Sequence, residues 1–198
     1  MMTAWMLARA SGFTAYIALA IAAITGLLLS SKYMGKKASR SLTLVHEATS
    51  IAGVILIFVH AWAILNDSFF EFTLGTLLVP GLSPYAPLWV GVGVIAGYLS
   101  TVVVASFYLR KKIGPRTWRR IHYSTPVAFA AMTAHGIGAG SDSANVFAAG
   151  LYSSVTVVVV VLLGYRIVAS AAGRKVKAER KAAAVARVAS RQGSVVKG

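Results

Sequence analysis

The sequence of 198 residues contains no cysteine, which excludes disulfide bonds, iron–sulfur clusters and zinc sites built from thiolates. Acidic residues are also scarce: five Asp and Glu stand against 20 Lys and Arg, and charged residues form 13% of the chain. Soluble domains carry about 25% charged residues, so a water-soluble globular domain is not expected. Apolar residues are abundant instead, at 57% of the chain with a mean hydropathy of +0.71, which excludes a disordered chain and indicates an integral membrane protein.

Long apolar runs define the predicted fold. Five runs approach the length of about 20 residues that a helix needs to cross a bilayer, and they cover Phe13–Ser30, Leu42–Leu65, Leu88–Leu109, Ile121–Gly138 and Val146–Ile167. The first run has 18 residues, more than the roughly 7–15 apolar residues of a signal peptide, so we expect a retained helix. The sequence therefore predicts an all-α integral membrane bundle of about five transmembrane helices, and no internal repeat is visible in it.

The basic residues lie in blocks between alternate apolar runs, so the net charge of +15 indicates membrane topology rather than nucleic-acid binding. Because basic loops stay in the cytoplasm, we expect a multi-pass protein of a bacterial plasma membrane, with the N-terminus outside and the C-terminus inside. Residues 1–12 then form a short extracytoplasmic N-terminus, residues 13–168 the membrane domain, and residues 169–198 a basic cytoplasmic tail. The blocks are Lys32, Lys36, Lys37 and Arg40; Arg110, Lys111, Lys112, Arg116, Arg119 and Arg120; and Arg166, Arg174, Lys175, Lys177, Arg180 and Lys181.

Two further segments have a characteristic composition. Residues 67–87 are apolar but interrupted by Pro80, Pro84 and Pro87, which predicts a short helix lying on the outer interface. Residues 173–198 are basic and rich in Ala and Val, and we expect a frayed tail in contact with anionic lipid in preference to a docking helix.

All four histidines lie in predicted membrane-spanning helices, two in the second and two in the fourth. His46 and His60 are fourteen positions apart, so on a straight helix they face nearly the same way about 21 Å from each other. Because both helices run from inside to outside, we expect His46 and His122 near the inner surface and His60 and His135 near the outer one. The spacing of His122 and His135 falls about 140° short of four helical turns, but Pro126 can kink or overwind that helix.

Depth-matched histidine pairs predict two bis-His haem sites between the second and fourth helices, since two imidazoles can bind opposite faces of a planar macrocycle. The competing interpretations are histidines that hydrogen-bond one helix to another and histidines of a proton or metal pathway. Glu47 is the carboxylate near the membrane, and we expect it to pair with a basic residue of the inner loop. Gly53, midway between His46 and His60, would leave room between two stacked haems.

Other residues carry weaker indications. Gly93 and Gly97 form a GxxxG motif on the third helix, which favours close helix packing, with haem clearance as the alternative. Arg116, Arg119 and Arg120 are interpreted as topology determinants, and they could also pair with the propionates of an inner haem.

The region around the third and fourth histidines carries a family resemblance. Residues 117–122 read Thr-Trp-Arg-Arg-Ile-His and are followed by Ala134-His135-Gly136, while residues 78–80 and 84–87 read Leu-Val-Pro and Pro-Tyr-Ala-Pro. This pattern resembles the ferric reductase-like transmembrane domain of ferric-chelate reductases, NADPH oxidases and the haem-binding membrane subunit of a bacterial methionine sulfoxide reductase system. The resemblance covers about residues 13–168. It implies two haem b groups, with iron bound axially by His46 and His122 at the inner site and by His60 and His135 at the outer site.

The resemblance also implies a function, namely electron transfer across the membrane. The donor would be a cytoplasmic flavin- or NAD(P)H-dependent protein in a separate chain, and the acceptor an extracytoplasmic ferric chelate or partner protein. Unlike the large family members, the sequence shows no flavin or nicotinamide domain and no nucleotide-binding motif, so we expect the membrane component of an oxidoreductase. The alternatives are a haem-binding subunit that supplies electrons to a partner repair oxidoreductase, and a non-redox membrane transporter or scaffold. The lipid bilayer is an expected partner and nucleic acid is not.

Overall fold

The computed structural model describes residues 2–30, 35–68 and 71–195. Helices account for most of these residues, and the described part contains no strand, as the sequence predicts. The helices are α1 (Met2–Ser30), α2 (Lys36–Leu65), α3 (Leu74–Leu78), α4 (Pro87–His122), α5 (Thr125–Ala139) and α6 (Val146–Val195).

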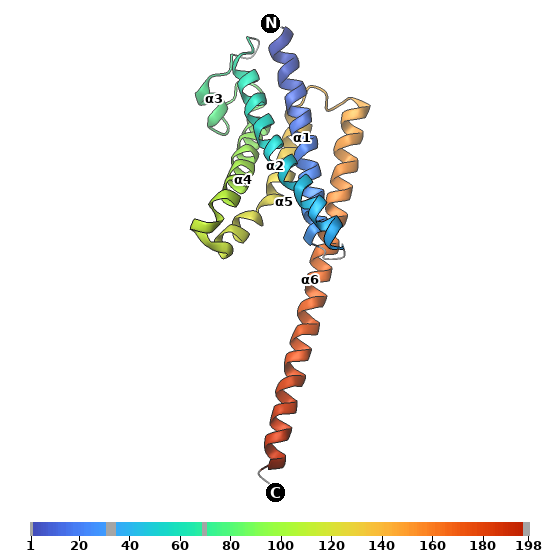
Figure 1. Ribbon diagram of the computed structural model, residues 1–198. Coiled ribbons are helices and arrows are strands. Elements are labelled where there is room, and N and C mark those ends of the chain that lie inside the picture. The colour runs from blue at the N-terminus through green and yellow to red at the C-terminus, as the bar shows by residue number, and fades with distance from the viewer. Residues whose placement is uncertain (1, 31–34, 69–70, 196–198) are drawn as a thin grey trace.

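The long helices run alternately up and down (Figure 1). α1 packs along α2, and α4 packs along α5, so the bundle consists of two antiparallel hairpins with fewer contacts between them than within them. α6 packs against α1 and α5 and then continues far beyond the other helices (Figure 1). The short helix α3 lies at the opposite end of the bundle from this projection.

Four of these helices are long and apolar enough to cross a membrane, as a multi-pass membrane protein requires: Ala4–Ser30, Lys36–Leu65, Pro87–His122 and Val146–Arg180. Many of their large apolar side chains are exposed on the outside of the bundle, among them Phe58, Trp62 and Val161, where lipid rather than water would surround them. The predicted fourth span is realised as α5, which has 15 residues and a length of about 22 Å against the roughly 30 Å of a hydrocarbon core. Five crossings therefore stay a prediction.

Several helix boundaries differ from those expected. α1 begins at Met2 rather than at Phe13, so residues expected to form a short outer N-terminus belong to the first helix. The helix that ends at His122 contains a kink at Gly114, whose φ of 81° lies in a region that favours glycine, followed by Pro115. α6 runs on to Val195, so the segment expected to fray is helical in the described residues.

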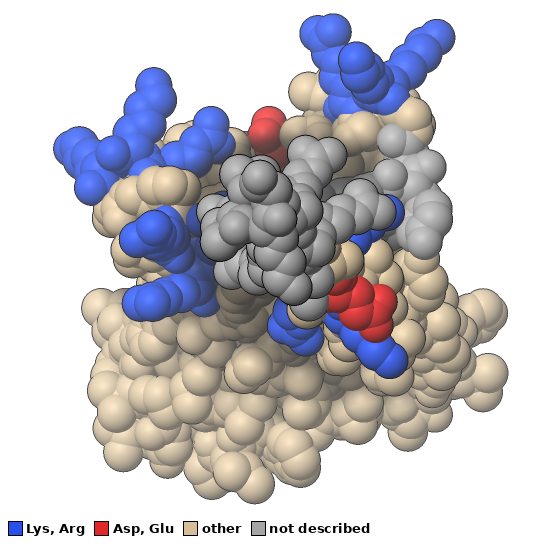
Figure 2. All heavy atoms as spheres, turned by 90° about the horizontal axis from the view of Figure 1, so that it is seen from below, with Lys and Arg blue, Asp and Glu red and all other residues tan. Residues whose placement is uncertain are grey.

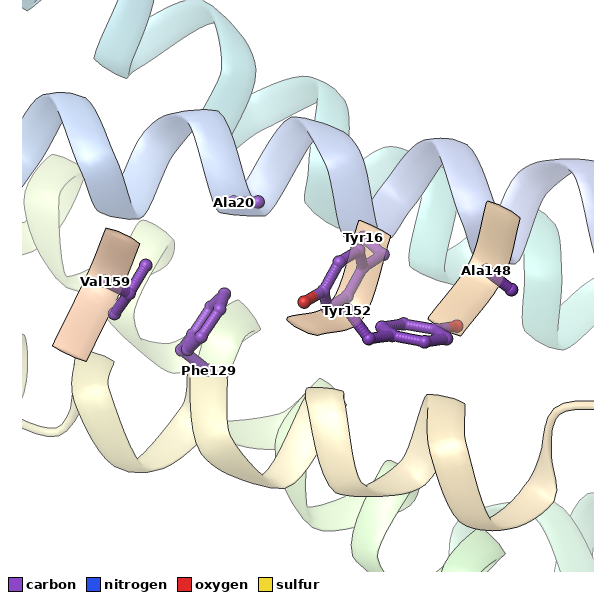
Figure 3. Packing of buried hydrophobic residues seen from close by; sticks show 6 residues of the cluster. All are labelled: Tyr16, Ala20, Phe129, Ala148, Tyr152 and Val159. Carbon is purple, nitrogen blue, oxygen red and sulfur yellow. The ribbon is translucent and has the colours of Figure 1, made fainter. Parts of the chain in front are cut away.

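The apolar core lies where α1, α5 and α6 meet (Figure 3). Tyr16 of α1 is at its centre: its ring meets the ring of Tyr152 edge-on at 4.7 Å between centroids, and the ring of Phe129 lies 6.1 Å away. The small residues Ala20 and Ala148 let these helices approach closely. The four histidines lie outside this cluster, on the side of the bundle formed by α2, α4 and α5.

Basic side chains gather at one end of the bundle, the end from which α6 projects (Figure 2). This end holds the start of α2 and the kinked end of α4, which carry most of the basic blocks seen in the sequence. The charge asymmetry expected from the sequence is therefore present in space as well as along the chain.

Candidate functional site

The four histidines form two close pairs between the two hairpins. His46 and His60 lie on α2, His122 is the last residue of α4, and His135 lies on α5. The ring centroids of His46 and His122 are 6.2 Å apart, and those of His60 and His135 are 6.3 Å apart. The pairing by depth that the sequence predicts is thus present, whereas the role of these residues as iron ligands stays a prediction.

The spacing within each pair fits a single metal ion between two imidazoles. An imidazole nitrogen lies about 1.1 Å from its ring centroid and binds a metal at about 2.0 Å, so opposed ligands place their centroids about 6.2 Å apart. The two rings of each pair are nearly perpendicular, with interplanar angles of 74° and 77°. The two pairs therefore share one geometry at two depths.

Backbone carbonyls hold three of the four rings in place. Nδ1 of His46 donates to the carbonyl oxygen of Ala22 at 2.8 Å, and Nδ1 of His60 donates to that of Ala8 at 2.7 Å. Nδ1 of His135 likewise donates to the carbonyl of Trp89, at 2.9 Å. These bonds place the proton on Nδ1 and leave Nε2, on the far side of the ring, as the unprotonated nitrogen that can bind a metal.

His122 is held differently. Within the described residues no carbonyl accepts a hydrogen bond from its ring, and the ring lies against the Trp118 indole instead, with centroids 5.5 Å apart at 31°. Trp118 is on the short final stretch of α4 after the kink, so this stretch positions both side chains.

Glycines face three of the histidines from the neighbouring helices. A Cβ built on Gly12 would lie 3.0 Å from Nδ1 of His60, and one on Gly26 would lie 3.1 Å from Cε1 of His46. A Cβ on Gly93 would collide with the ring of His135. The GxxxG glycine Gly93 therefore clears space for a candidate ligand. Gly12 and Gly26 are not among the residues predicted from the sequence, although they are fourteen residues apart, the same spacing as the two histidines of α2.

Each histidine pair opens into a cavity. We name the two cavities outer and inner after the depths expected from the sequence. The outer cavity, about 210 Å³, is lined by His60, His135 and the three α1 and α4 residues Gly12, Gly93 and Gly97. The inner cavity, about 450 Å³, is lined by His46, His122 and Trp118 among others. Ser100 and Met132 line both cavities, so these two side chains form the partition between them.

Each cavity is also lined by an arginine, and neither of these two is among the arginines considered as propionate partners. Arg9 lines the outer cavity and forms a bidentate ion pair with Asp142, with nitrogen–oxygen distances of 2.8 and 2.5 Å. Arg166 lines the inner cavity, as does Trp118, whose indole nitrogen is buried and has no hydrogen-bond acceptor among the described residues. Such an unpaired donor fits a cavity that receives an anionic group. The three arginines proposed as propionate partners, Arg116, Arg119 and Arg120, are exposed and line neither cavity.

Two other expectations need correction. Glu47 lines the inner cavity and forms no ion pair with a described basic residue, so the expected pairing with the inner loop is wrong for that part of the chain. Gly53 leaves no room for a cofactor, because the Leu19 side chain of α1 fills the space beside it: a Cβ there would lie 2.5 Å from Cγ of Leu19.

A helix break explains why a spacing of thirteen residues still aligns two histidines with their partners. His122 and His135 are on different helices, separated by Tyr123 and Ser124. The amide of Ser124 donates to the carbonyl of Ile121, a tighter turn than an α-helix makes. Overwinding near Pro126, as expected from the sequence, thus occurs just before that residue.

Comparison with known proteins gives one finding. A family described only as a domain of unknown function matches residues 3–142, which span α1 to the loop before α6 and include all four histidines. No curated protein matches the chain, and no solved structure matches it. Since the match covers more than half of the sequence, the chain belongs to this family, DUF8596.

Proposed function

We propose that this protein carries electrons across a membrane through two b-type haems, one bound by His46 and His122 and the other by His60 and His135. The observation that supports this most directly is the repeated pair geometry, with centroids at 6.2 and 6.3 Å and similar interplanar angles. Incidental polar contacts between helices would not be expected to repeat at two depths with the same distance and angle. The resemblance to ferric reductase-like domains rests on the same histidines.

The donor set favours a haem over a bare metal ion. Among the described residues there is no group of three or more His, Asp or Glu side chains that could hold a metal ion, so each pair supplies two ligands. A tetrahedral or octahedral metal site needs four to six ligands. A porphyrin brings four nitrogens of its own, and two axial imidazoles complete the coordination of its iron.

The cavities differ in how readily they accept a macrocycle. The inner cavity of about 450 Å³ is within the usual range for ligand sites, which is about 300–1,000 Å³. The buried Trp118 N–H and Arg166 are suited to binding the anionic propionates there. The outer cavity is smaller, and a small separation of the two hairpins would enlarge it, since few contacts join them.

The chemistry follows from the ligand set. A haem held by two histidines would have no open iron position, so it would supply one-electron transfer and not oxygen binding. The protein's contribution is to fix the ligand tautomers through the carbonyls of Ala8, Ala22 and Trp89 and to exclude water with apolar side chains. With the basic end of the bundle in the cytoplasm, electrons would enter at His46 and His122 and leave near Arg9 and Asp142.

The test is the haem content of the purified full-length protein and of its single histidine variants. We expect a pyridine haemochrome ratio near two per chain, and a highly anisotropic low-spin electron paramagnetic resonance signal, as perpendicular imidazole planes produce. A ratio near zero after expression with ample haem would refute the proposal.

The histidine variants test the assignment of ligands. His60→Ala and His135→Ala should both lose the outer haem and keep the inner one, while His46→Ala and His122→Ala should share the complementary loss. Gly164→Ala, on α6 with open space around its Cα, is the matched control and should keep both haems. If His60→Ala and His122→Ala matched each other instead, the pairing would be crossed and the proposed path wrong.

A further inference from the structure

α1 contains a repeated pentapeptide that faces the two histidines of α2. Residues 8–12 read Ala-Arg-Ala-Ser-Gly and residues 22–26 read Ala-Ala-Ile-Thr-Gly, so Ala, a hydroxyl residue and Gly recur at a spacing of fourteen. Fourteen residues are two heptads, and in helices packed at about 3.5 residues per turn this spacing returns to the same face. His46 and His60 have the same spacing on the antiparallel helix, so both ends of the repeat meet a histidine.

The glycine of each repeat exposes the carbonyl that the histidine uses. A helical side chain leans toward the N-terminus and covers the turn before it, so the residue at position i+4 shields the carbonyl of residue i. Gly12 follows Ala8 by four residues and Gly26 follows Ala22 by four, and these are the two carbonyls that accept the Nδ1 protons. Gly93 stands in the same relation to the Trp89 carbonyl, which accepts from His135.

The hydroxyl of each repeat contacts the same carbonyl. Ser11 Oγ donates to the Leu7 oxygen at 2.5 Å and lies 3.2 Å from that of Ala8. Thr25 Oγ1 repeats this arrangement, at 2.7 Å from the Ile21 oxygen and 3.1 Å from that of Ala22. Both hydroxyl residues are buried. The hydroxyl proton is shared between two carbonyls as a bifurcated bond, so the Ala8 and Ala22 oxygens each accept from a hydroxyl as well as from an imidazole N–H. A carbonyl oxygen that gives electron density to a further donor binds the imidazole N–H less strongly.

We propose that the two pentapeptides of α1, Ala8–Gly12 and Ala22–Gly26, are positioning elements that orient His60 and His46, and that Ser11 and Thr25 adjust the strength of the histidine hydrogen bonds. The inference rests on the proposed haem function. A stronger Nδ1–H···O=C bond makes the imidazole a more basic ligand and favours ferric iron, so each hydroxyl raises the midpoint potential of its own haem. The hydrogen bonds to the Ala8 carbonyl come from Ser11 and His60, and the side chains of Arg9 and Ala10 take no part in them.

The experiment is a redox titration of the purified full chain that resolves two spectral components. Gly12→Ala should change the midpoint potential and g-values of the outer haem alone, and Gly26→Ala those of the inner haem alone, because the added methyl group displaces one ring by a few tenths of an ångström. Gly150→Ala and Gly164→Ala add the same group where nothing lies within 4 Å, and they should change neither component.

Ser11→Ala and Thr25→Val provide a second test that adds no bulk. Ser11→Ala should lower the outer midpoint potential and Thr25→Val the inner one, each without effect on the other haem. An effect at both haems, at the wrong haem or at neither would overturn the inference. A wild-type protein without haem would instead refute the proposed function, so the two failures are distinguishable.

Discussion

Gly93→Ala is the most informative single change at the outer site. A Cβ at this position would lie 2.6 Å from Cγ of His135 and 2.7 Å from its Cε1, closer than side-chain atoms pack. The ring must therefore move away from α4, and its 2.9 Å hydrogen bond to the Trp89 carbonyl breaks or lengthens. Overpacking costs about 1–3 kcal/mol and a lost hydrogen bond about 0.5–1.5 kcal/mol, so together they amount to about 1.5–4.5 kcal/mol.

This cost falls on the geometry that would bind the proposed outer haem. It corresponds to a weakening of haem binding by roughly 10- to 2,000-fold, and we expect the outer haem to be lost during purification while the inner one stays. The assay is haem per chain by pyridine haemochrome, together with the number of components in a redox titration. Gly164→Ala on α6 is the control, since its Cβ would have no atom within 4 Å and the residue lines neither cavity. Equal haem retention in the two variants would refute the reasoning.

Three further predictions concern the scaffold. Arg9→Gln and Asp142→Asn should each lower the free energy of unfolding slightly, and a double-mutant cycle should give a coupling below about 1 kcal/mol, because the two side chains are 45% and 25% exposed. Gly114→Ala should lower the free energy of unfolding by about 1–3 kcal/mol, because φ is 81° at this position. Gly164→Ala should leave the free energy of unfolding unchanged, and thermal unfolding measures both. Single cysteines introduced at Ser143 and Gly173, in a chain that has none, should react with an impermeant thiol reagent from opposite sides of the membrane; reaction from one side would contradict five crossings.

The histidine pairs could be predicted from the sequence because two simple features determine them, a residue spacing and a charge distribution. The spacing of His46 and His60 fixes their common face, and the distribution of basic loops fixes which ends of the helices lie at the same depth. Neither argument requires the details of packing. The proximity of the pairs therefore follows from the sequence even though His122 ends α4 and does not lie in the helix of His135.

The sequence contains only a weak signal of the break between α4 and α5. The break falls at Tyr123 and Ser124, neither of which is a helix breaker, while Pro126 stands two residues later and fits the first turn of a new helix. At this turn the His122 ring lies beside the rings of Trp118 and His46, with centroids 5.5 and 6.2 Å away, and the contact with α2 cannot be read from the local sequence.

The partners of the histidines were harder to predict because they are backbone atoms. Any residue supplies a carbonyl, so Ala8 and Ala22 can be recognised as partners only through the glycines four residues after them. The positions of long basic side chains are hard to predict for a different reason, because closeness along the sequence does not decide which of them reaches a cavity. The arginines nearest to His122 in sequence point outward, and Arg166, from a distant part of the chain, lines the inner cavity instead.

The division of the bundle into two hairpins has a consequence for how the protein is assembled. Each histidine pair takes one member from α1–α2 and one from α4–α5, so neither half can complete a site before the halves meet. Both hairpins can insert as independent units, with their backbone hydrogen bonds satisfied internally. A flat apolar cofactor dissolved in the bilayer could then enter sideways along the seam between them, and its arrival would join the halves without the unfolding of any helix.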